Sequence, residues 1–316
     1  MLKSRSYEAD DDLRQMCEFV LKSDTSTVHA GDLQYRFSDP SVDRKKAVRI
    51  WEDDGNLVGF GFLHILCNEF IFETKAYANR SELERQIVEW ALEQFNKVAA
   101  DRYDWDQSLT TSVAEFDSER IALLEKKCFT RDEDYRICLD YSLDLPIPAA
   151  KLPEGFTMSY LKDVSEVQDY VAAYHRAFLF DYLNVEWRRK VLQMPGYVPE
   201  LDLIVVAPDG ELSAICFCWL EQSKNDFDVK KKGYIQSVGT QPKFQNLGIG
   251  QSLFATALQR LKAFGAQVAV GHTDADNIFA LRMYLSAGVR PLYRIHRYSW
   301  ESNVQAKEKK PQMFQV

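Results

Sequence analysis

The sequence predicts an α+β fold made of two tandem domains that share one architecture. The chain has 316 residues, and because domains typically hold about 100–200 residues, two are expected. Hydrophobic residues make up 46% of the chain and aromatic residues 13%, which is enough for packed cores and excludes a disordered protein. The same order of helical and β-rich segments also occurs twice along the chain.

The repeat is clearest at two hairpins. Asp54-Gly55 and Asp209-Gly210 lie 155 residues apart. Each dipeptide separates two β-rich runs, at 47–51 and 57–66 in the first half and at 203–206 and 212–220 in the second. Asp-Gly between such runs is a strong signal for a β-hairpin.

Around these hairpins both halves follow the order β-α-α-β-β-β-α-β-α-β. The later strands are expected at 70–74, 109–113 and 135–141, and again at 234–240, 267–270 and 292–300. The helices are expected at 13–21, 82–98 and 120–128, and again at 164–178, 250–264 and 278–287. Apolar residues recur at helical spacing in the two longer helices, namely Leu83, Ile87, Trp90, Ala91, Phe95, Leu253, Phe254, Ala257, Leu258 and Leu261.

The predicted domain boundaries and the charge distribution agree on two distinct halves. The first domain is expected at 1–144, a proline-containing linker at 145–155, the second domain at 156–300 and a polar tail at 301–316. Residues 1–150 carry 19 basic and 30 acidic side chains (net −11), whereas residues 151–316 carry 20 and 17 (net +3). This balance excludes a globally basic nucleic-acid binder, and it makes the second half the better partner for a polyanion.

Several other classes are also disfavoured. The six cysteines contain no Cys-x-x-Cys pair and the five histidines are scattered, so no metal site is expected. Cys216 and Cys218, two apart on a predicted strand, are expected to be core thiols on one face. No apolar run approaches the ~18–20 residues of a membrane span, and no signal peptide is visible. A cytoplasmic location is therefore expected.

One loop carries the most chemical information. A β-rich run ends at Pro242, and a loop with Gly248 and Gly250 leads into an amphipathic helix. Glycine permits positive φ and close approach of a ligand, and the first N–H groups of a helix lack internal partners. Such a loop suits a phosphate or pyrophosphate, although it is neither a dinucleotide fingerprint nor a Walker A loop. The alternative is an ordinary strand–loop–helix joint.

The loop resembles the acetyl-CoA loop of the GNAT N-acetyltransferases, whose pattern is V-x-P-x-x-[QR]-x-x-G-x-G/A. The matching stretch is Val238-x-Thr240-x-Pro242-x-x-Gln245-x-x-Gly248-x-Gly250. A second stretch, Asn277-x-x-Ala280-x-x-x-Tyr284-x-x-x-Gly288, resembles the N-x-x-A-x-x-x-Y-x-x-x-G helix of that family. The doubled arrangement is similar to tandem GNAT proteins such as mycothiol synthase. The resemblance implies that each domain is a mixed, mostly antiparallel sheet flanked by helices.

The resemblance also implies roles for individual residues, with acetyl-CoA as co-substrate and no metal. The residues expected to bind acetyl-CoA are Val238, Gly239, Thr240, Gln245, Asn246, Leu247, Gly248, Ile249, Gly250, Gln251 and Asn277. Tyr284 is the expected catalytic residue, which would protonate the departing thiolate. A phenol (pKa about 10) and a thiol (pKa about 8.5) are close enough for that transfer. The alternative for Tyr284 is a packed aromatic side chain.

Two departures from the family pattern leave questions open. Leu247 stands where many members carry a cation, and Lys243 is a candidate to compensate. Tyr234 stands where many members place a glutamate that acts as the general base. Nearby candidates for that base are Glu221, Asp226, Asp228 and His272. Water alone could also relay the proton.

The first half lacks the acetyl-CoA loop. Its corresponding stretch, Tyr77 to Arg85, contains no glycine, and Glu82 and Glu84 would repel a pyrophosphate at the helix start. We therefore expect a degenerate GNAT-like domain without cofactor binding. It is expected to buttress the second domain and to form one wall of the acceptor site.

The expected function is an acetyl-CoA-dependent N-acetyltransferase that acts on a primary amine of a small molecule, by direct attack in a ternary complex. The acidic first half would favour a cationic acceptor. Two alternatives remain, a non-catalytic CoA-binding module and a protein or peptide N-acetyltransferase. Neither nucleic acid nor a membrane is an expected partner, and the chain is expected to be a monomer or a homodimer.

Overall fold

The structure of the protein is a computed structural model that describes residues 2–23, 26–75, 79–99, 108–149, 151–178, 182–221 and 231–302. The chain divides into two compact units. Unit 1 comprises Met1–Asp12, Ser41–Glu133 and Ile295–Val316, and unit 2 comprises Leu13–Pro40 and Asp134–Arg294, as far as these ranges are described. The predicted tail lies outside the described residues from position 303 onward. Among the described residues, no helix has both the length and the apolar sequence needed to cross a bilayer.

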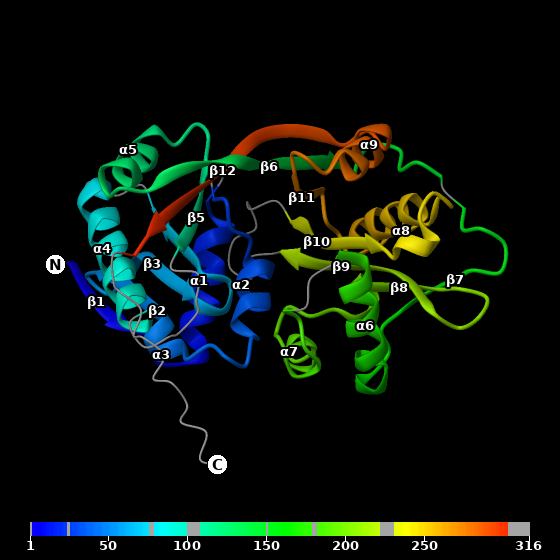
Figure 1. The fold of residues 1–316 in the computed structure, drawn as a ribbon, viewed down its shortest axis with the longest axis horizontal. Coiled ribbons are helices and arrows are strands. Elements are labelled where there is room, and N and C mark those ends of the chain that lie inside the picture. The colour runs from blue at the N-terminus through cyan, green and yellow to red at the C-terminus, as the bar shows by residue number, and fades with distance from the viewer. Residues whose placement is uncertain are drawn as a thin grey trace, which may run out of the picture. The chain divides into compact units, whose positions relative to one another are not determined.

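The order of elements predicted from the repeat is confirmed in both halves (Figure 1). The first half contains β1 (Leu2–Ser6), α1 (Asp10–Leu21), α2 (Ala30–Phe37), α3 (Arg44–Ala47), β2 (Val48–Asp53), β3 (Asn56–His64), β4 (Glu69–Thr74), α4 (Arg80–Ala99), β5 (Ser108–Ala114), α5 (Ser118–Lys126) and β6 (Thr130–Ser142). The second half contains β7 (Thr157–Tyr160), α6 (Val167–Phe178), α7 (Val185–Val191), β8 (Asp202–Val206), β9 (Leu212–Glu221), β10 (Lys232–Thr240), α8 (Ile249–Ala263), β11 (Val268–Asp274), α9 (Ile278–Ser286) and β12 (Arg290–Glu301). The short α3 and four 3₁₀ turns were not predicted.

Each unit takes one strand from the other half of the sequence. In unit 1 the strand order is β1-β2-β3-β4-β5-β12, and in unit 2 it is β6-β11-β10-β9-β8-β7. Strand β12 pairs antiparallel with β5 from Ile295 to Glu301, and β6 pairs antiparallel with β11 from Arg136 to Ser142. The last strand of each half is therefore exchanged. Parallel pairing occurs between β4 and β5 and between β10 and β11, so each sheet is mixed and mostly antiparallel, as predicted.

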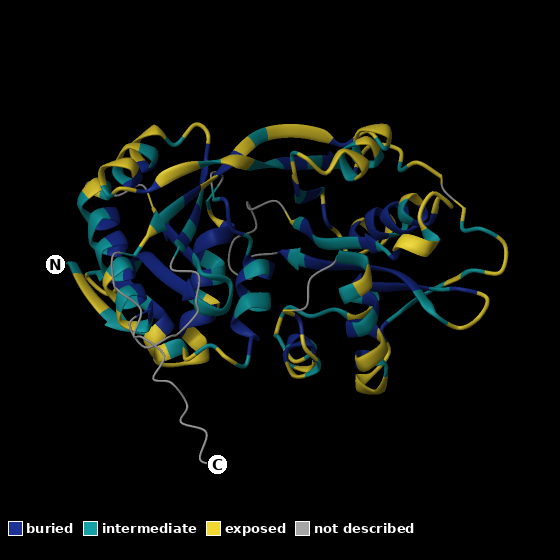
Figure 2. Cartoon of the chain, in the orientation of Figure 1, coloured by how far each residue is buried: buried dark blue, intermediate teal, exposed yellow. Residues whose placement is uncertain are grey.

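The two faces of the unit 2 sheet carry different helices (Figure 1). Helix α8 covers one face, where its apolar positions Leu253, Ala257, Leu258 and Leu261 are fully buried against Cys216 and Cys218. The two thiols therefore lie in the core on one face, as predicted. Helices α6 and α2 pack on β9 and β10 from the other face, where Trp219 lies against Gly31. Figure 2 shows β9 buried along most of its length.

Unit 1 has its own core, built in the same way from helix α4 and strands β3 to β5. The predicted helical stripe of Leu83, Ile87, Ala91 and Phe95 is buried there. Gly61 on β3 allows close packing, because a Cβ at this position would lie 2.8 Å from Cζ3 of Trp90. Tyr298 on the exchanged strand β12 belongs to this core.

Candidate functional site

The candidate site begins where two parallel strands of unit 2 separate. Strands β10 and β11 pair from Lys232↔Val268 to Ile235↔Gly271. Beyond this point β10 continues to Thr240 and β11 continues to Asp274. Because the pairing ends five residues before the end of β10 and three residues before the end of β11, the sheet opens there. The backbone groups of β10 on this side are left for another partner.

A bulge in β10 sits at the start of this opening. The register between β9 and β10 shifts between Ile235 and Ser237. A bulge adds a residue and re-aims the side chains that follow it. Ile235 and Val238 accordingly both face the α8 side of the sheet. Gly239 faces α6, where a Cβ would lie 2.6 Å from Cζ of Phe178.

The loop after β10 presents free backbone donors. Asn246 and Gly248 both adopt positive φ, at 63° and 78°. Gly248 is the N-cap of α8 and supplies no side-chain cap. In the described part of the chain, no hydrogen bond is formed by the amides of residues 246–251. A Cβ on Gly248 would meet nothing within 4 Å, so the space in front of the helix is open. These features fit an anionic group at the start of α8.

The side chains of the loop have separate tasks. Gln245 donates from Nε2 to the carbonyl oxygen of Thr240 at 3.1 Å, which closes the loop on itself. Ile249 is buried in the core and anchors the first turn of α8. Leu247 and Gln251 are exposed. Lys243 pairs with Glu211, so its charge is engaged beside the loop.

Helix α9 carries the second motif. Asn277 is its N-cap, and the side-chain oxygen accepts a hydrogen bond from the backbone N–H of Ala280 at 3.1 Å. Gly288, four residues after Tyr284, adopts a φ of 86° just beyond the helix. Asn277 therefore caps the start of this helix, and Ala280 lies in its first turn. Gly288 follows its end.

Tyr284 lies against helix α8 and lines a pocket. Its ring is edge-on to Phe254, with centroids 5.0 Å apart. The same pocket is lined by Ile235, Gly271 and His272, which flank the point where β10 and β11 separate. Burial, and the nearby Cys216 and Cys218, raise the pKa of Tyr284 well above its usual value. The phenol is therefore protonated at neutral pH and able to donate a hydrogen bond.

A cluster of aromatic and titratable side chains occupies the opposite face of the sheet at the same point. The His29 ring stacks on Tyr234 with centroids 4.1 Å apart, and its centroid is 5.0 Å from that of His272. His29 Nδ1 lies 3.2 Å from Oε2 of Glu221. The other oxygen of Glu221 accepts a hydrogen bond from the N–H of Gly31 at 2.9 Å.

Charged groups on α2 and β6 surround this cluster. Arg36 donates to Asp32 at 3.0 Å, and Asp32 accepts from Gln236 of the β10 bulge at 3.3 Å. Burial and Asp32 raise the pKa of Tyr234 well above its usual value, against the opposing charges of Arg136 and Arg36. Tyr234 thus remains a neutral phenol and cannot replace a carboxylate base.

The sequence offered four candidates for the general base, and the structure places only some of them in this cluster. Glu221 and His272 lie in the cluster, whereas Asp226 and Asp228 lie outside the described residues. His29 was not among the candidates. It precedes Glu221 by 192 residues, and no motif surrounds it, so no signal in the sequence could place it here.

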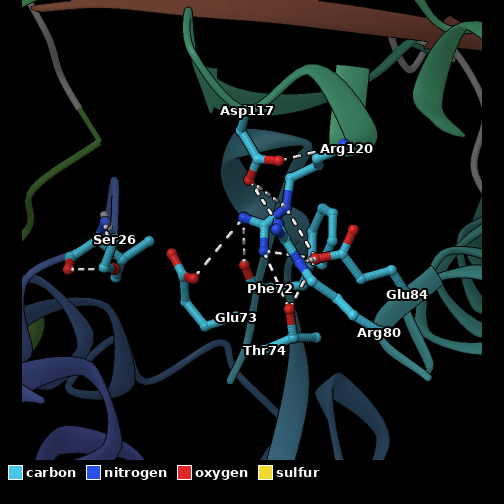
Figure 3. A network of polar contacts seen from close by, with 9 residues as sticks. Ser26, Phe72, Glu73, Thr74, Arg80, Glu84, Asp117 and Arg120 are labelled. Atoms are coloured by element: carbon cyan, nitrogen blue, oxygen red, sulfur yellow. Dashed lines mark hydrogen bonds and ion pairs between the residues drawn. The ribbon is translucent and has the colours of Figure 1, made fainter. Parts of the chain in front are cut away.

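Unit 1 contains a second opening of the same kind. Strands β4 and β5 pair in parallel only at Glu69↔Thr110 and Phe70↔Thr111, although β4 continues to Thr74 and β5 to Ala114. Figure 3 shows the polar network around Arg120 at this opening. Arg120 donates to the carbonyl oxygen of Phe72 and to Thr74 Oγ1, both at 3.4 Å, and to Glu84 Oε1 at 2.8 Å. Arg120 and Glu84 are both buried.

The start of α4 is closed by further ion pairs. Arg80 donates to Glu84 at 3.0 Å and lies 2.5 Å from Asp117. Glu84, predicted to repel a pyrophosphate, instead points inward and is bonded by two arginines. Glu82 lies at the surface, paired with Arg85. The predicted stretch begins with Tyr77 and Ala78, which lie outside the described residues.

Comparison with known proteins is consistent with this geometry. Residues 167–289 match the model of the acetyltransferase (GNAT) family. A mycothiol acetyltransferase of Sanguibacter keddieii is 30% identical over 156 residues, which cover 48% of this chain and 49% of that protein. A mycothiol acetyltransferase of Frankia casuarinae is 26% identical over 193 residues, covering 57% and 55%. The chain therefore spans about half the length of the curated relatives it matches.

Solved structures match over nearly the whole chain. A tandem GNAT protein from the clavulanic acid biosynthesis pathway superimposes with a TM-score of 0.69 at 15% identity, covering 95% of this chain and 98% of that one. A GCN5-related N-acetyltransferase from Sphaerobacter thermophilus gives a TM-score of 0.66 at 18% identity, covering 95% of each chain. At these identities the likeness concerns the fold.

Proposed function

Because the chain has the tandem architecture of the GNAT acetyltransferase superfamily, we propose that it transfers an acetyl group from acetyl-CoA to a primary amine of a small molecule. The observation that carries this proposal is the opening between β10 and β11. The loop with free amides at the start of α8 follows β10 at this opening. The protonated Tyr284 lies on one face of the sheet there, and the cluster of His29, Glu221 and His272 lies on the other. That arrangement suits a thioester held at the point where the strands separate.

The residues that would hold acetyl-CoA are those expected from the sequence. The free amides of residues 246–251 would bind the pyrophosphate at the start of α8. Val238, Gly239 and Thr240 would offer the backbone of β10 to the pantetheine arm, since this stretch has no partner in β11. Asn277 would orient the arm through its amide nitrogen, because its oxygen is already engaged with Ala280. When bound, acetyl-CoA supplies the activated acyl group.

Tyr284 would assist departure of the thiolate. Its raised pKa keeps the proton on the phenol until the thiolate forms. Burial also disfavours a thiolate in the same pocket, so both groups shift in the same direction and the transfer stays close to balance. Backbone N–H groups of β10 near Val238 would stabilise the negative charge that develops on the carbonyl oxygen of the thioester.

The acceptor would enter from the face that carries His29. His29 and Glu221 line a pocket together with Val20 and Val28. Val20, Val28 and His29 come from the first half of the sequence and belong to unit 2. The first half therefore supplies part of the wall of this pocket. The relatives named mycothiol acetyltransferase favour a small-molecule acceptor. We propose that unit 1, whose opening is filled by Arg120, binds no acetyl-CoA.

The test is release of free thiol from acetyl-CoA by the purified protein with polyamines, aminosugars and peptides as acceptors. We expect turnover with at least one small-molecule amine and a fall in kcat of about 10-fold or more in Tyr284→Phe, while acetyl-CoA affinity stays within about 2-fold. Phe254→Leu, next to Tyr284, is a packing control.

Two outcomes would contradict the proposal. Binding of acetyl-CoA without turnover on any amine would indicate a CoA-binding module. Turnover confined to peptides would indicate a protein or peptide N-acetyltransferase.

A further inference from the structure

His29 is held in one orientation by contacts on three sides. It is the N-cap of α2, with extended backbone angles of −103° and 149°. Tyr234 of β10 stacks on one side of its ring at 4.1 Å, and His272 of β11 lies 5.0 Å away. The His29 side chain is 12% exposed. The ring therefore lies where β10 and β11 begin to separate, on the face opposite Tyr284.

Glu221 determines which ring nitrogen of His29 can accept a proton. Its carboxylate is 3% exposed, and it accepts from Gly31 N–H through one oxygen while the other faces His29 Nδ1. A carboxylate that accepts from Nδ1–H leaves the lone pair of a neutral imidazole on Nε2. That Nε2 atom is buried, and it has no hydrogen-bond partner among the described residues. A buried polar atom without a partner is costly unless something binds it during function.

We propose that His29 is the general base of the reaction, taking a proton from the acceptor ammonium through Nε2, and that Glu221 is the residue that positions it. This role rests on the proposed acetyl transfer. It uses a residue from the first half of the sequence, and it answers the question left by Tyr234, which cannot serve as a carboxylate base.

The proton and electron balance can be written in full. His29 Nε2 accepts one proton from the ammonium, and the freed lone pair attacks the thioester carbon. The N–C bond forms and the C–S bond breaks, with its electron pair leaving on sulfur. The thiolate takes the Tyr284 proton, and the second proton lost by the nitrogen restores the tyrosine. His29 then returns its proton to solvent, so the products are the amide, free thiol and one proton.

His272 is a weaker candidate for this role. Burial, His29 and Arg136 lower its pKa well below the usual value, and its Nε2 also lacks a partner among the described residues. No carboxylate of the described residues is hydrogen-bonded to its ring. Among the described residues, the charged and titratable groups around His29 and Glu221 are Tyr234, His272, Asp32, Arg36, Arg136, Cys17, Cys138, Asp140, Lys232 and Tyr293. With Glu221, three of the charges are negative and three are positive, so they largely balance.

The decisive experiment compares His29→Gln with the wild type on an amine that the wild type acetylates. We expect kcat/KM at neutral pH to fall about 10²–10⁴-fold, with acetyl-CoA affinity unchanged within about 2-fold. The acid limb of the pH profile of kcat/KM should move to higher pH. In His29→Ala, added imidazole should restore part of the rate. Glu221→Gln, whose amide nitrogen cannot accept a hydrogen bond, leaves either His29 Nδ1–H or Gly31 N–H without its acceptor and should lower kcat by about 10-fold or more.

His175→Gln is the matched control. His175 is a half-buried histidine of the same unit, but its Nε2 is engaged with the carbonyl oxygen of Leu183 at 2.7 Å. This variant should keep the wild-type rate and pH profile.

The outcomes separate this role from the function on which it rests. An active wild type with an unaffected His29→Gln rate and pH profile overturns the role alone. Loss of activity that parallels loss of acetyl-CoA affinity or of thermal stability, without rescue by imidazole, makes His29 structural and also overturns it. A wild type that acetylates no amine overturns the proposed function, and the role falls with it.

Discussion

Each unit has an opening where two parallel strands separate. The strands separate in the same way in both units, but a side chain fills the opening of unit 1 and none of the described side chains is placed in that of unit 2. In unit 2, β10 and β11 separate after Ile235 and Gly271, and the loop leading to α8 presents free amides. In unit 1, β4 and β5 separate after Phe70 and Thr111, and the guanidinium of Arg120 occupies the space. Arg120 even bonds the carbonyl oxygen of Phe72, a backbone group of the kind a pantetheine arm would meet.

The difference depends on a few positions that can be matched through the helix caps. Asp117 caps α5 by accepting from Arg120 N–H at 3.3 Å, and Asn277 caps α9 by accepting from Ala280 N–H at 3.1 Å. Arg120 and Ala280 are thus equivalent third residues. Seven residues after each cap stand Leu124 and Tyr284. Eleven residues after each cap, Cys128 and Gly288 have φ of 64° and 86°. We therefore predict that a small residue at the third position leaves the opening free, whereas an arginine there closes it.

The largest expected effect on acetyl-CoA binding comes from reproducing the closed state in unit 2. Ala280→Arg should place a long cation where the pantetheine arm would lie, and we expect acetyl-CoA affinity to fall by at least about 10²-fold, or more than about 2.7 kcal/mol. Isothermal titration calorimetry measures the loss against the single site per chain expected for the wild type. Ala280→Ser, which stays small, should bind normally. Unchanged affinity in Ala280→Arg would show that the third position does not control the opening.

The next effect comes from emptying the closed opening in unit 1. Arg120→Ala leaves the buried Glu84 with one arginine fewer, and breaking a buried ion pair costs about 3–5 kcal/mol of unfolding free energy. Denaturant unfolding measures this loss, and the number of acetyl-CoA sites should remain one. Lys97→Ala breaks an exposed pair with Glu93 in the same unit and should cost less than about 1 kcal/mol. Gain of a second acetyl-CoA site in Arg120→Ala would mean that the Arg120 side chain alone prevents binding in unit 1.

The smallest effect tests the glycine at the start of α8. Gly248→Ala and Gly210→Ala both place a Cβ at positive φ in open space, at 78° and 88°. Each should cost about 1–2 kcal/mol of stability. Only Gly248→Ala should weaken the binding of acetyl-CoA, by about 10-fold. The backbone would relax away from the strained positive φ, and this would move the loop amides. Equal affinities in the two variants would mean that the loop before α8 does not bind the cofactor.

Much of the fold could be predicted because it is encoded locally. The Asp-Gly turns, the apolar stripe of α4 and the stripe of α8 each depend on neighbours within a few residues. Asp54 and Gly55 do adopt positive φ, at 49° and 79°. The exchange of β6 and β12 could not be read in this way, because the strand pattern of Tyr135 to Tyr141 is the same whichever sheet it joins.

The candidate site divides along the same line. The loop from Gln245 to Gln251 and the helix with Tyr284 are short contiguous motifs, so their residues could be named from the sequence, and their roles remain predictions. The contents of the unit 1 opening were anticipated only as repulsion by Glu82 and Glu84. Glu84 is instead a buried partner of Arg80 and Arg120, a pairing that depends on residues 36 apart in sequence.

The sequence by itself determined the doubled architecture, the glycine loop and the helix that carries Asn277 and Tyr284, because short-range turn chemistry, capping and periodicity encode them. The tertiary structure alone decided which unit each last strand joins, which opening is filled, and that His29 meets Glu221, Tyr234 and His272. Those outcomes depend on packing between segments up to 243 residues apart, the separation of His29 and His272, and the amino-acid order along either segment carries no record of its partner.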